Sequence, residues 1–109
     1  MFDKMKLYIA VLDEVPSNMV PVLTAHAVLG FHLEYNRQSI TYNNWLAQSF
    51  KKVVVKVTRS EFDEIKKLRG VHLAHESSVL NGEKSCAVIV PYDPRKQPEM
   101  LQNAKLWAP

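Results

Sequence analysis

The chain has 109 residues, which is the length of one domain with a single core. Its hydrophobic fraction of 47% and charged fraction of 23% are ordinary for a soluble globular protein. No apolar run approaches the roughly 18 residues that a membrane-spanning helix needs, and the net charge of +3 permits an anionic partner without requiring one.

The start of the chain and its single cysteine favour a cytoplasmic location. The first six residues lead straight into a predicted strand, without the apolar region and small-residue cleavage site of a signal peptide. Cys86 has no second cysteine with which to form an internal disulfide, which fits a reducing compartment.

The first half of the chain predicts a strand, a polar loop and an apolar helix. The strand is expected over Met5–Leu12, the loop over Asp13–Asn18 and the helix over about Met19–Tyr35. A polar connector, Asn36–Ser39, then precedes a short helix expected over Tyr42–Ala47.

A β-branched run over Lys52–Val57 predicts the next strand, and its apolar centre predicts an interior position in the sheet. Thr58 and Glu61 have the spacing of a capping box that opens a helix. Apolar residues follow at helical spacing, and Gly70 is expected to close the helix in a left-handed conformation. These residues are Phe62, Ile65 and Leu68.

Two further strands are expected over Val71–His75 and Cys86–Val90, joined through the hairpin signal Asn81-Gly82. Pro91 and Pro94 end the second of them.

A last helix is predicted over Gln97–Lys105, with Met100 and Leu101 facing inward, before Leu106-Trp107. The order of elements predicts a single α/β domain with a four-stranded mixed sheet and helices on both faces.

Three features resemble the type 2 peptidyl-tRNA hydrolase fold family. They are Ala25-His26-Ala27 on the first helix, Trp45 ahead of the valine-rich strand, and the hairpin over Val71–Pro91. The resemblance covers nearly the whole chain and implies the fold of that family, closest to its members that lack the full active-site signature.

The family's first helix reads Lys-x-x-x-Gln-x-Ala-His-Ala, and the chain resembles it only in part. His26 is retained, but Met19 stands at the lysine position and Leu23 at the glutamine position. A thioether and a leucine supply no charge, proton or hydrogen-bond donor for ester hydrolysis. The resemblance therefore implies that this chemistry is lost or altered.

A second motif of the family, Asp-Ala-Gly-x-Thr after the third strand, falls between Leu73 and Ser78. An ungapped match places Leu73 at the aspartate, and a short gap places His75 or Glu76 there. In each case the aspartate is absent or replaced.

The resemblance and the helix N-terminus together predict a ligand site where the first helix starts, facing the hairpin. Its candidate residues are Ser17, Asn18, Met19, Leu23, His26, His75, Glu76, Ser77 and Ser78. His26 has two interpretations, a core histidine on an apolar face or a wall of this pocket. Ser17 or Asn18 is equally well placed to be a plain helix cap.

We therefore expect a non-catalytic or catalytically altered binding module that takes a polar, nucleotide-like or RNA-like ligand. One alternative is a peptidyl-tRNA hydrolase with His26 as its catalytic residue. Another is a structural domain that presents the apolar helix to a protein partner. No cofactor and no metal site are predicted, because neither His26 and His32 nor His72 and His75 have a spacing that brings both to one side.

Two surface features also suggest partners. The segment from Lys51 to Arg69 carries seven Lys or Arg residues against three acidic ones, which indicates either a solvated exterior or an RNA-facing surface. The first helix is apolar nearly all round, which predicts a homodimer through this helix or through the connector Asn36–Trp45. Alternatively, the connector and Leu106-Trp107 cover the helix within one chain.

Overall fold

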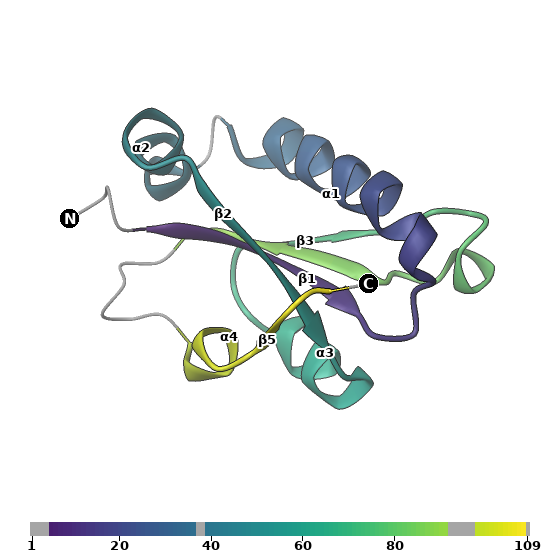
Figure 1. The fold of residues 1–109 in the computed structure, drawn as a ribbon. Helices are drawn as coiled ribbons and strands as arrows, with labels where there is room; N and C mark the ends of the chain where they lie inside the picture. Colours follow the sequence, from purple (N-terminus) through teal and green to yellow (C-terminus); the bar gives the residue numbers. More distant parts are fainter. Residues whose placement is uncertain (1–4, 37–38, 92–97, 109) are drawn as a thin grey trace.

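A computed structural model describes residues 5–36, 39–91 and 98–108. Within these residues, five strands form one mixed sheet in the order β3-β4-β1-β2-β5 (Figure 1). The α/β class and the mixed sheet predicted from the sequence are thus confirmed, but the sheet has five strands rather than four.

The centre of the sheet is made by β1 (Lys6–Leu12) and its two neighbours. It pairs in parallel with β2 (Lys51–Val57), so that Lys6 lies opposite Lys51. On its other side it pairs antiparallel with β4 (Cys86–Ile89). The edge strand β3 (Val71–Ala74) is antiparallel to β4.

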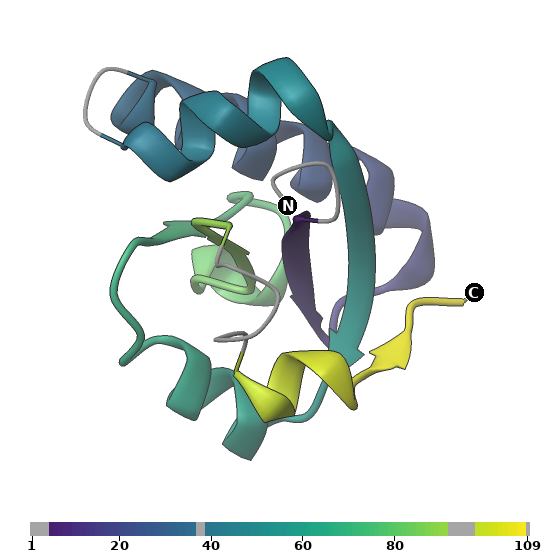
Figure 2. The same cartoon turned by 90° about the vertical axis from the view of Figure 1, so that its left-hand side faces the viewer.

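Helices cover both faces of this sheet, as predicted. A parallel pair needs a long crossover connection, which is supplied here by α1 (Val20–Tyr35) and α2 (Ile40–Gln48) on one face. On the opposite face lie α3 (Arg59–Ile65) and α4 (Glu99–Gln102), as the view along the sheet in Figure 2 also shows. Within the described residues, no helix has the length and apolar character needed to cross a bilayer.

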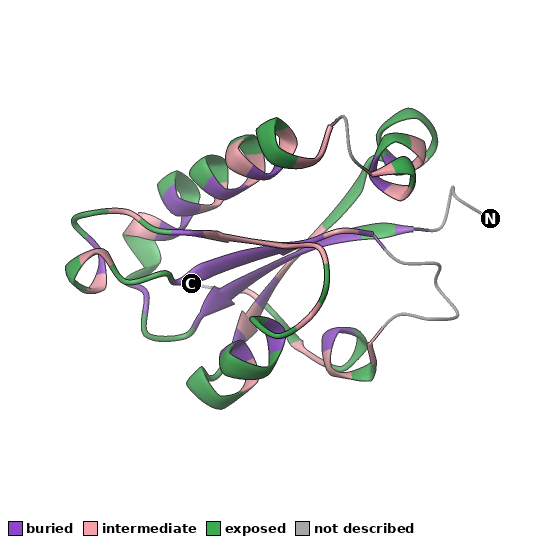
Figure 3. Ribbon diagram, turned by 180° about the vertical axis from the view of Figure 1, so that it is seen from behind, coloured by how far each residue is buried: buried purple, intermediate pink, exposed green. Residues whose placement is uncertain are grey.

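The core fills the two layers between the sheet and its helices (Figure 3). All four residues of β4 and all but the first of β1 are buried, because helices cover both sides of these central strands. The helices contribute Val20, Leu23, Ala27, Phe31, Tyr42, Trp45, Phe62, Ile65 and Leu101.

Two local signals in the sequence form as predicted. The Thr58 side chain accepts a hydrogen bond from the Glu61 backbone N–H, and the Glu61 carboxylate accepts one from the Thr58 N–H, which completes the capping box. The loop that contains Asn81-Gly82 joins two antiparallel strands, although it runs from residue 75 to 85. Leu80, Asn81 and Gly82 all have positive φ there.

The end of the chain differs from the prediction. The last helix is only α4, and β5 (Lys105–Leu106) follows it as a fifth strand along β2. The backbone N–H of Trp107 continues this pairing by donating to the Val54 carbonyl at 2.9 Å. The helix is shorter than predicted because Lys105 and Leu106 form hydrogen bonds with the open edge of β2. This pairing is a non-local interaction. Pro94 and Gln97 lie outside the described residues.

One smaller prediction also needs correction, and another is confirmed. The helix over Phe62 ends at Ile65, and Gly70 closes the following turn, with φ 69°, rather than the helix itself. The predicted interior position of β2 is confirmed, since β1 and β5 flank it, but only the two-residue β5 lies outside it, and Val53 and Val54 are half-buried rather than buried.

Candidate functional site

The chain enters α1 through a short 3-10 turn rather than through a capped first turn. The turn spans Ser17–Met19, and the N-cap position of α1 falls on Met19, whose side chain makes no capping hydrogen bond. Neither Ser17 nor Asn18 caps the helix with its side chain, and both are exposed. The interpretation of these two residues as plain helix caps is therefore wrong.

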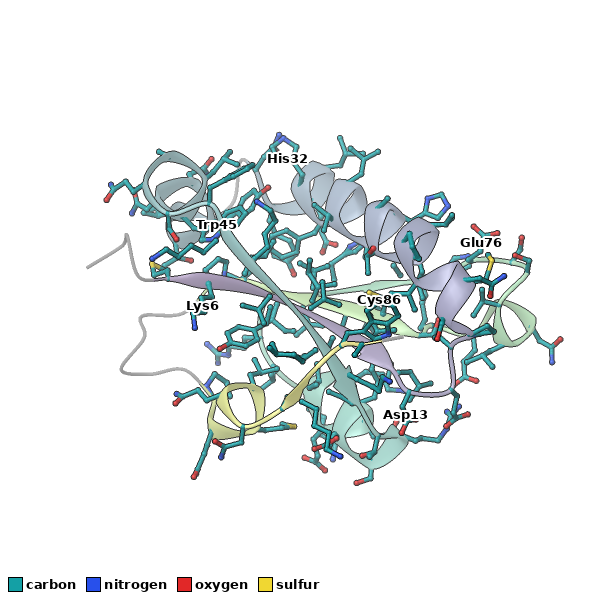
Figure 4. The ribbon with its side chains drawn as sticks, in the orientation of Figure 1. Lys6, Asp13, His32, Trp45, Glu76 and Cys86 are labelled. Carbon is teal, nitrogen blue, oxygen red and sulfur yellow. The ribbon has the colours of Figure 1, made fainter. Side chains whose placement is uncertain are left out.

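Two turns into α1, His26 meets the loop that follows β3. Its Nε2 lies 2.9 Å from Oε2 of Glu76, fifty residues away in sequence. Figure 4 shows Glu76 at the end of the molecule where α1 begins, beside the hairpin loop. The fold thus brings together the first helix and the hairpin, as the candidate site requires.

The carboxylate of Glu76 is held from several sides. Its second oxygen, Oε1, accepts hydrogen bonds from Ser77 Oγ at 3.4 Å and from Ser78 Oγ at 3.3 Å. Desolvation by itself raises the pKa of Glu76, but the backbone N–H of Ser78, the His26 ring and the Ser78 hydroxyl together lower that pKa. Glu76 is therefore an ionised acceptor at neutral pH.

The ionised carboxylate decides which nitrogen of His26 carries the proton. Because a carboxylate only accepts hydrogen bonds, His26 Nε2 donates, and in the neutral ring Nδ1 is left with a lone pair. The side chain of His26 is 55% exposed, so a ligand can approach the ring. The site can accept a hydrogen bond or a proton from a bound molecule.

The same geometry argues against a serine nucleophile. Ser77 and Ser78 bond to Glu76 rather than to His26, so neither hydroxyl is placed to pass its proton to the imidazole. The two serines orient the carboxylate, and the carboxylate orients the ring.

The interpretation of His26 as a core residue is wrong. The buried stripe of α1 consists of Val20, Leu23, Ala27 and Phe31, and His26 projects outside it. Leu23, which stands among the candidate site residues, is fully buried. Met19 is half-buried, and His75 is exposed just after β3.

A second histidine–carboxylate pair, which the sequence did not predict, joins α1 to β3 at its other end. His72 Nδ1 lies 2.7 Å from Glu34 Oε1. The pairs are crossed, with the histidine on the helix in one and on the strand in the other. His26 and Glu34 are eight residues apart on the helix, a rise of about 12 Å. This is close to the span of the four-residue extended step from His72 on β3 to Glu76 just beyond it.

The cations on α3 and directly after it are compensated by nearby acids. Arg59 bonds to both Glu14 and Glu83 and so links the loop after β1 to the loop before β4. The hydrogen bond from Arg59 and its charge lower the pKa of Glu14, against a smaller opposing effect of desolvation. Lys66 and Lys67 pair with acids three residues earlier.

Among the residues that the structure describes, no three His, Cys, Asp or Glu side chains gather into a possible metal site. Comparison of the sequence with models of known protein families found no match, and a search among curated proteins also found none.

Proposed function

We propose that this protein is a binding module with the type 2 peptidyl-tRNA hydrolase-like fold, and that it takes a polar, nucleotide-like ligand beside the N-terminal half of α1. The observation that carries the proposal is the His26–Glu76 pair. It is a fixed polar group on the exposed side of a helix whose other outward residues are mostly apolar.

The chemistry of the pair favours a ligand that presents a hydrogen-bond donor. The Nδ1 lone pair of His26 accepts from a hydroxyl or a ring N–H, both of which nucleosides carry. The hydroxyls of Ser77 and Ser78 lie at the same carboxylate and add further polar contacts.

The His26–Glu76 pair and its two serines include no Lys or Arg, and this favours binding over hydrolysis. A developing oxyanion needs donors or positive charge aimed at it, and Met19 and Leu23 supply neither. An imidazole oriented by a carboxylate is nevertheless a competent general base. For this reason peptidyl-tRNA hydrolysis, with His26 as the base, is the second candidate function.

The binding experiment uses nucleoside monophosphates as probes in a titration followed by NMR. We expect shifts in the residues around His26 in the wild type, and weaker binding in His26→Ala and in Glu76→Gln. Glu64→Gln is the matched control, because Glu64 lies on α3, on the other face of the sheet. Equal binding by all variants, or no binding by the wild type, would overturn the proposal.

An assay of peptidyl-tRNA turnover separates the two functions. If the protein is a binding module, we expect the ester bond of peptidyl-tRNA to stay intact. Turnover by the wild type that disappears in His26→Ala would establish the hydrolase instead.

A further inference from the structure

On the side of the sheet where α1 and α2 lie, the strand β2 is left partly open. Lys52 Nζ lies 5.5 Å from the centroid of the Trp45 ring on α2, so Lys52 points to this side of the sheet. Side chains alternate along a strand, so Val54 and Lys56 point the same way. The helix α1 packs over β1, β3 and β4. Lys52 is exposed, and Val54 and Lys56 are only half-buried.

The short strand β5 extends this open surface. Lys105 lies opposite Lys56 in the register of the two strands. The backbone N–H of Trp107 donates to the Val54 carbonyl, so Trp107 continues the register opposite Val54. Paired residues of neighbouring strands share one face of the sheet. Figure 2 shows β2 and β5 side by side, at the side of the sheet away from β3. We name Lys52, Val54, Lys56, Lys105 and Trp107 the open face of β2 and β5.

An aromatic side chain stands at the start of the open face. Phe50 directly precedes β2, and its ring stacks on Trp45 with 5.4 Å between the centroids. Lys52 Nζ lies over the Phe50 ring, 3.3 Å from its centroid. This ammonium is nearly as close to the Trp45 centroid as the Phe50 ring is, so Lys52 and Trp45 lie on the same side of Phe50. The opposite side of the ring is open, and Phe50 is 58% exposed.

The backbone places the Phe50 ring at an energetic cost. Its φ is 61°, in the left-handed region that a bulky side chain rarely adopts. A glycine would adopt this conformation without strain. Strained residues of this kind gather at ligand sites, where the surrounding structure holds them in place.

The lysines of the open face have no acidic partner among the residues that the structure describes. Lys52 Nζ donates to the Phe50 carbonyl at 2.7 Å, and Lys56 Nζ donates to the Ala108 carbonyl at 2.9 Å. Like charges directly opposite each other, as Lys56 and Lys105 are, destabilise a pair of strands. By contrast, the cations on α3 and directly after it are paired with acids. An anion bound at the open face would relieve the repulsion between its lysines.

We propose that the open face of β2 and β5, together with Phe50, binds single-stranded nucleic acid. Lysine side chains hold the phosphates, and the rings of Phe50 and Trp107 stack on bases, which is the common way of binding single strands without sequence preference. Phosphates and base faces are common to RNA and DNA, so both are ligands. The open face includes neither His26 nor Glu76, so this site goes beyond the nucleotide-like ligand proposed beside α1.

The relative exposure of the side chains favours nucleic acid over a membrane surface. Insertion into a bilayer requires apolar side chains that reach beyond the cations around them. In the open face Lys52 and Lys105 are exposed, whereas Val54 and Trp107 are half-buried. A base can still stack on a ring that lies in the surface of a sheet, as aromatic residues of sheet-based RNA-binding modules do.

Fluorescence anisotropy of the full chain with labelled oligouridylate and oligothymidylate of about 12 nucleotides tests the site. We expect both to bind, with a dissociation constant on the order of 10 to 100 µM at low salt. Contacts from three lysines should give a slope of about −2 for the logarithm of the binding constant against that of the salt concentration. Lys105→Gln should reduce this slope by about 0.7. Lys67→Gln is the matched control, because Lys67 lies just after α3 on the other side of the sheet and pairs with Glu64.

Two further variants test stacking separately from charge. Phe50→Leu and Trp107→Leu keep an apolar side chain but remove a ring, and each should weaken binding by about 5-fold or more. Leu106→Ala is their control, because Leu106 also lies on β5 but alternates to the opposite side of the sheet. Phe50 precedes the strand and is exposed, so its variant is informative even where Trp107→Leu loosens β5.

Three results would contradict the proposal. The first is a wild type that binds neither oligonucleotide, including one that binds phosphatidylserine vesicles instead. The second is binding that both ring variants retain in full, or that Lys67→Gln weakens as much as Lys105→Gln does. The third is loss of oligonucleotide binding in His26→Ala, which would place the strand at the site beside α1. Failure of the His26 site with nucleoside monophosphates would leave these oligonucleotide results unchanged, so the two proposals can fail separately.

Discussion

Gly30 lies on α1 directly over the ring of His72, and this contact decides how the helix responds to substitution. A Cβ added at Gly30 would come 2.5 Å from His72 Nε2 and 3.0 Å from Cε1. The ring has limited freedom to move away, since its Nδ1 is bonded to Glu34 at 2.7 Å and its side chain is only 21% exposed.

One favourable and two unfavourable effects set the change in the free energy of unfolding for Gly30→Ala. Alanine in place of glycine within a helix stabilises it by about 0.8–1 kcal/mol. Against this, forcing a side chain into a filled space costs about 1–3 kcal/mol. Displacing the partly exposed His72–Glu34 pair costs up to about 1 kcal/mol more. We therefore expect Gly30→Ala to destabilise the wild type by about 1 kcal/mol, from the balance of these effects.

Removal of the His72 ring should reverse the sign of the stability change caused by Gly30→Ala. In a His72→Ala background the added methyl group meets no imidazole, so Gly30→Ala should stabilise the fold by about 1 kcal/mol. The two substitutions are thus coupled by about 2 kcal/mol in a double-mutant cycle.

Urea unfolding of the wild type, the two single variants and the double variant measures this coupling. Ala25→Gly, at an exposed position of the same helix, calibrates the helix propensity and should destabilise by about 1 kcal/mol. If Gly30→Ala stabilised the wild type by the amount that Ala25→Gly destabilises it, the reasoning about His72 would be refuted.

Three further predictions concern other parts of the fold. Thr58→Ala removes the capping-box acceptor of α3 and should lower the free energy of unfolding by about 1 kcal/mol in urea, whereas an unchanged midpoint would contradict the role of the cap. Burial raises the pKa of Cys86 to about 12, so a thiol reagent at mildly alkaline pH should label the protein only in denaturant, and rapid labelling of the native protein would contradict this. The pKa of Glu76 is lowered in the folded protein, so its contribution to stability is present above the unfolded pKa and is lost as the pH falls through the folded value. Glu76→Gln should therefore flatten the acid side of the stability profile, and a profile with the wild-type slope would show that this carboxylate is not linked to folding.

The local signals in this sequence determined much of the fold. The β-branched residues of β2 and the Thr58–Glu61 capping box depend on neighbours within a few residues, so their structure could be predicted without the rest of the chain. The antiparallel pairing of β3 with β4 follows in the same way from the loop between them. By contrast, β5 forms because Lys105 and Leu106 meet the open edge of β2, about fifty residues earlier in the chain.

The candidate site could be predicted only in part, for a related reason. The sequence placed His26 and Glu76 in one region through a family resemblance, but their direct pairing depends on how α1 lies across β3. A helix that is apolar nearly all round does not reveal which stripe faces the sheet. Only the tertiary packing decided that Leu23 and Phe31 are buried while His26, Leu29 and Leu33 remain exposed, because the burial of one stripe of α1 against β1, β3 and β4 leaves the opposite side in solvent.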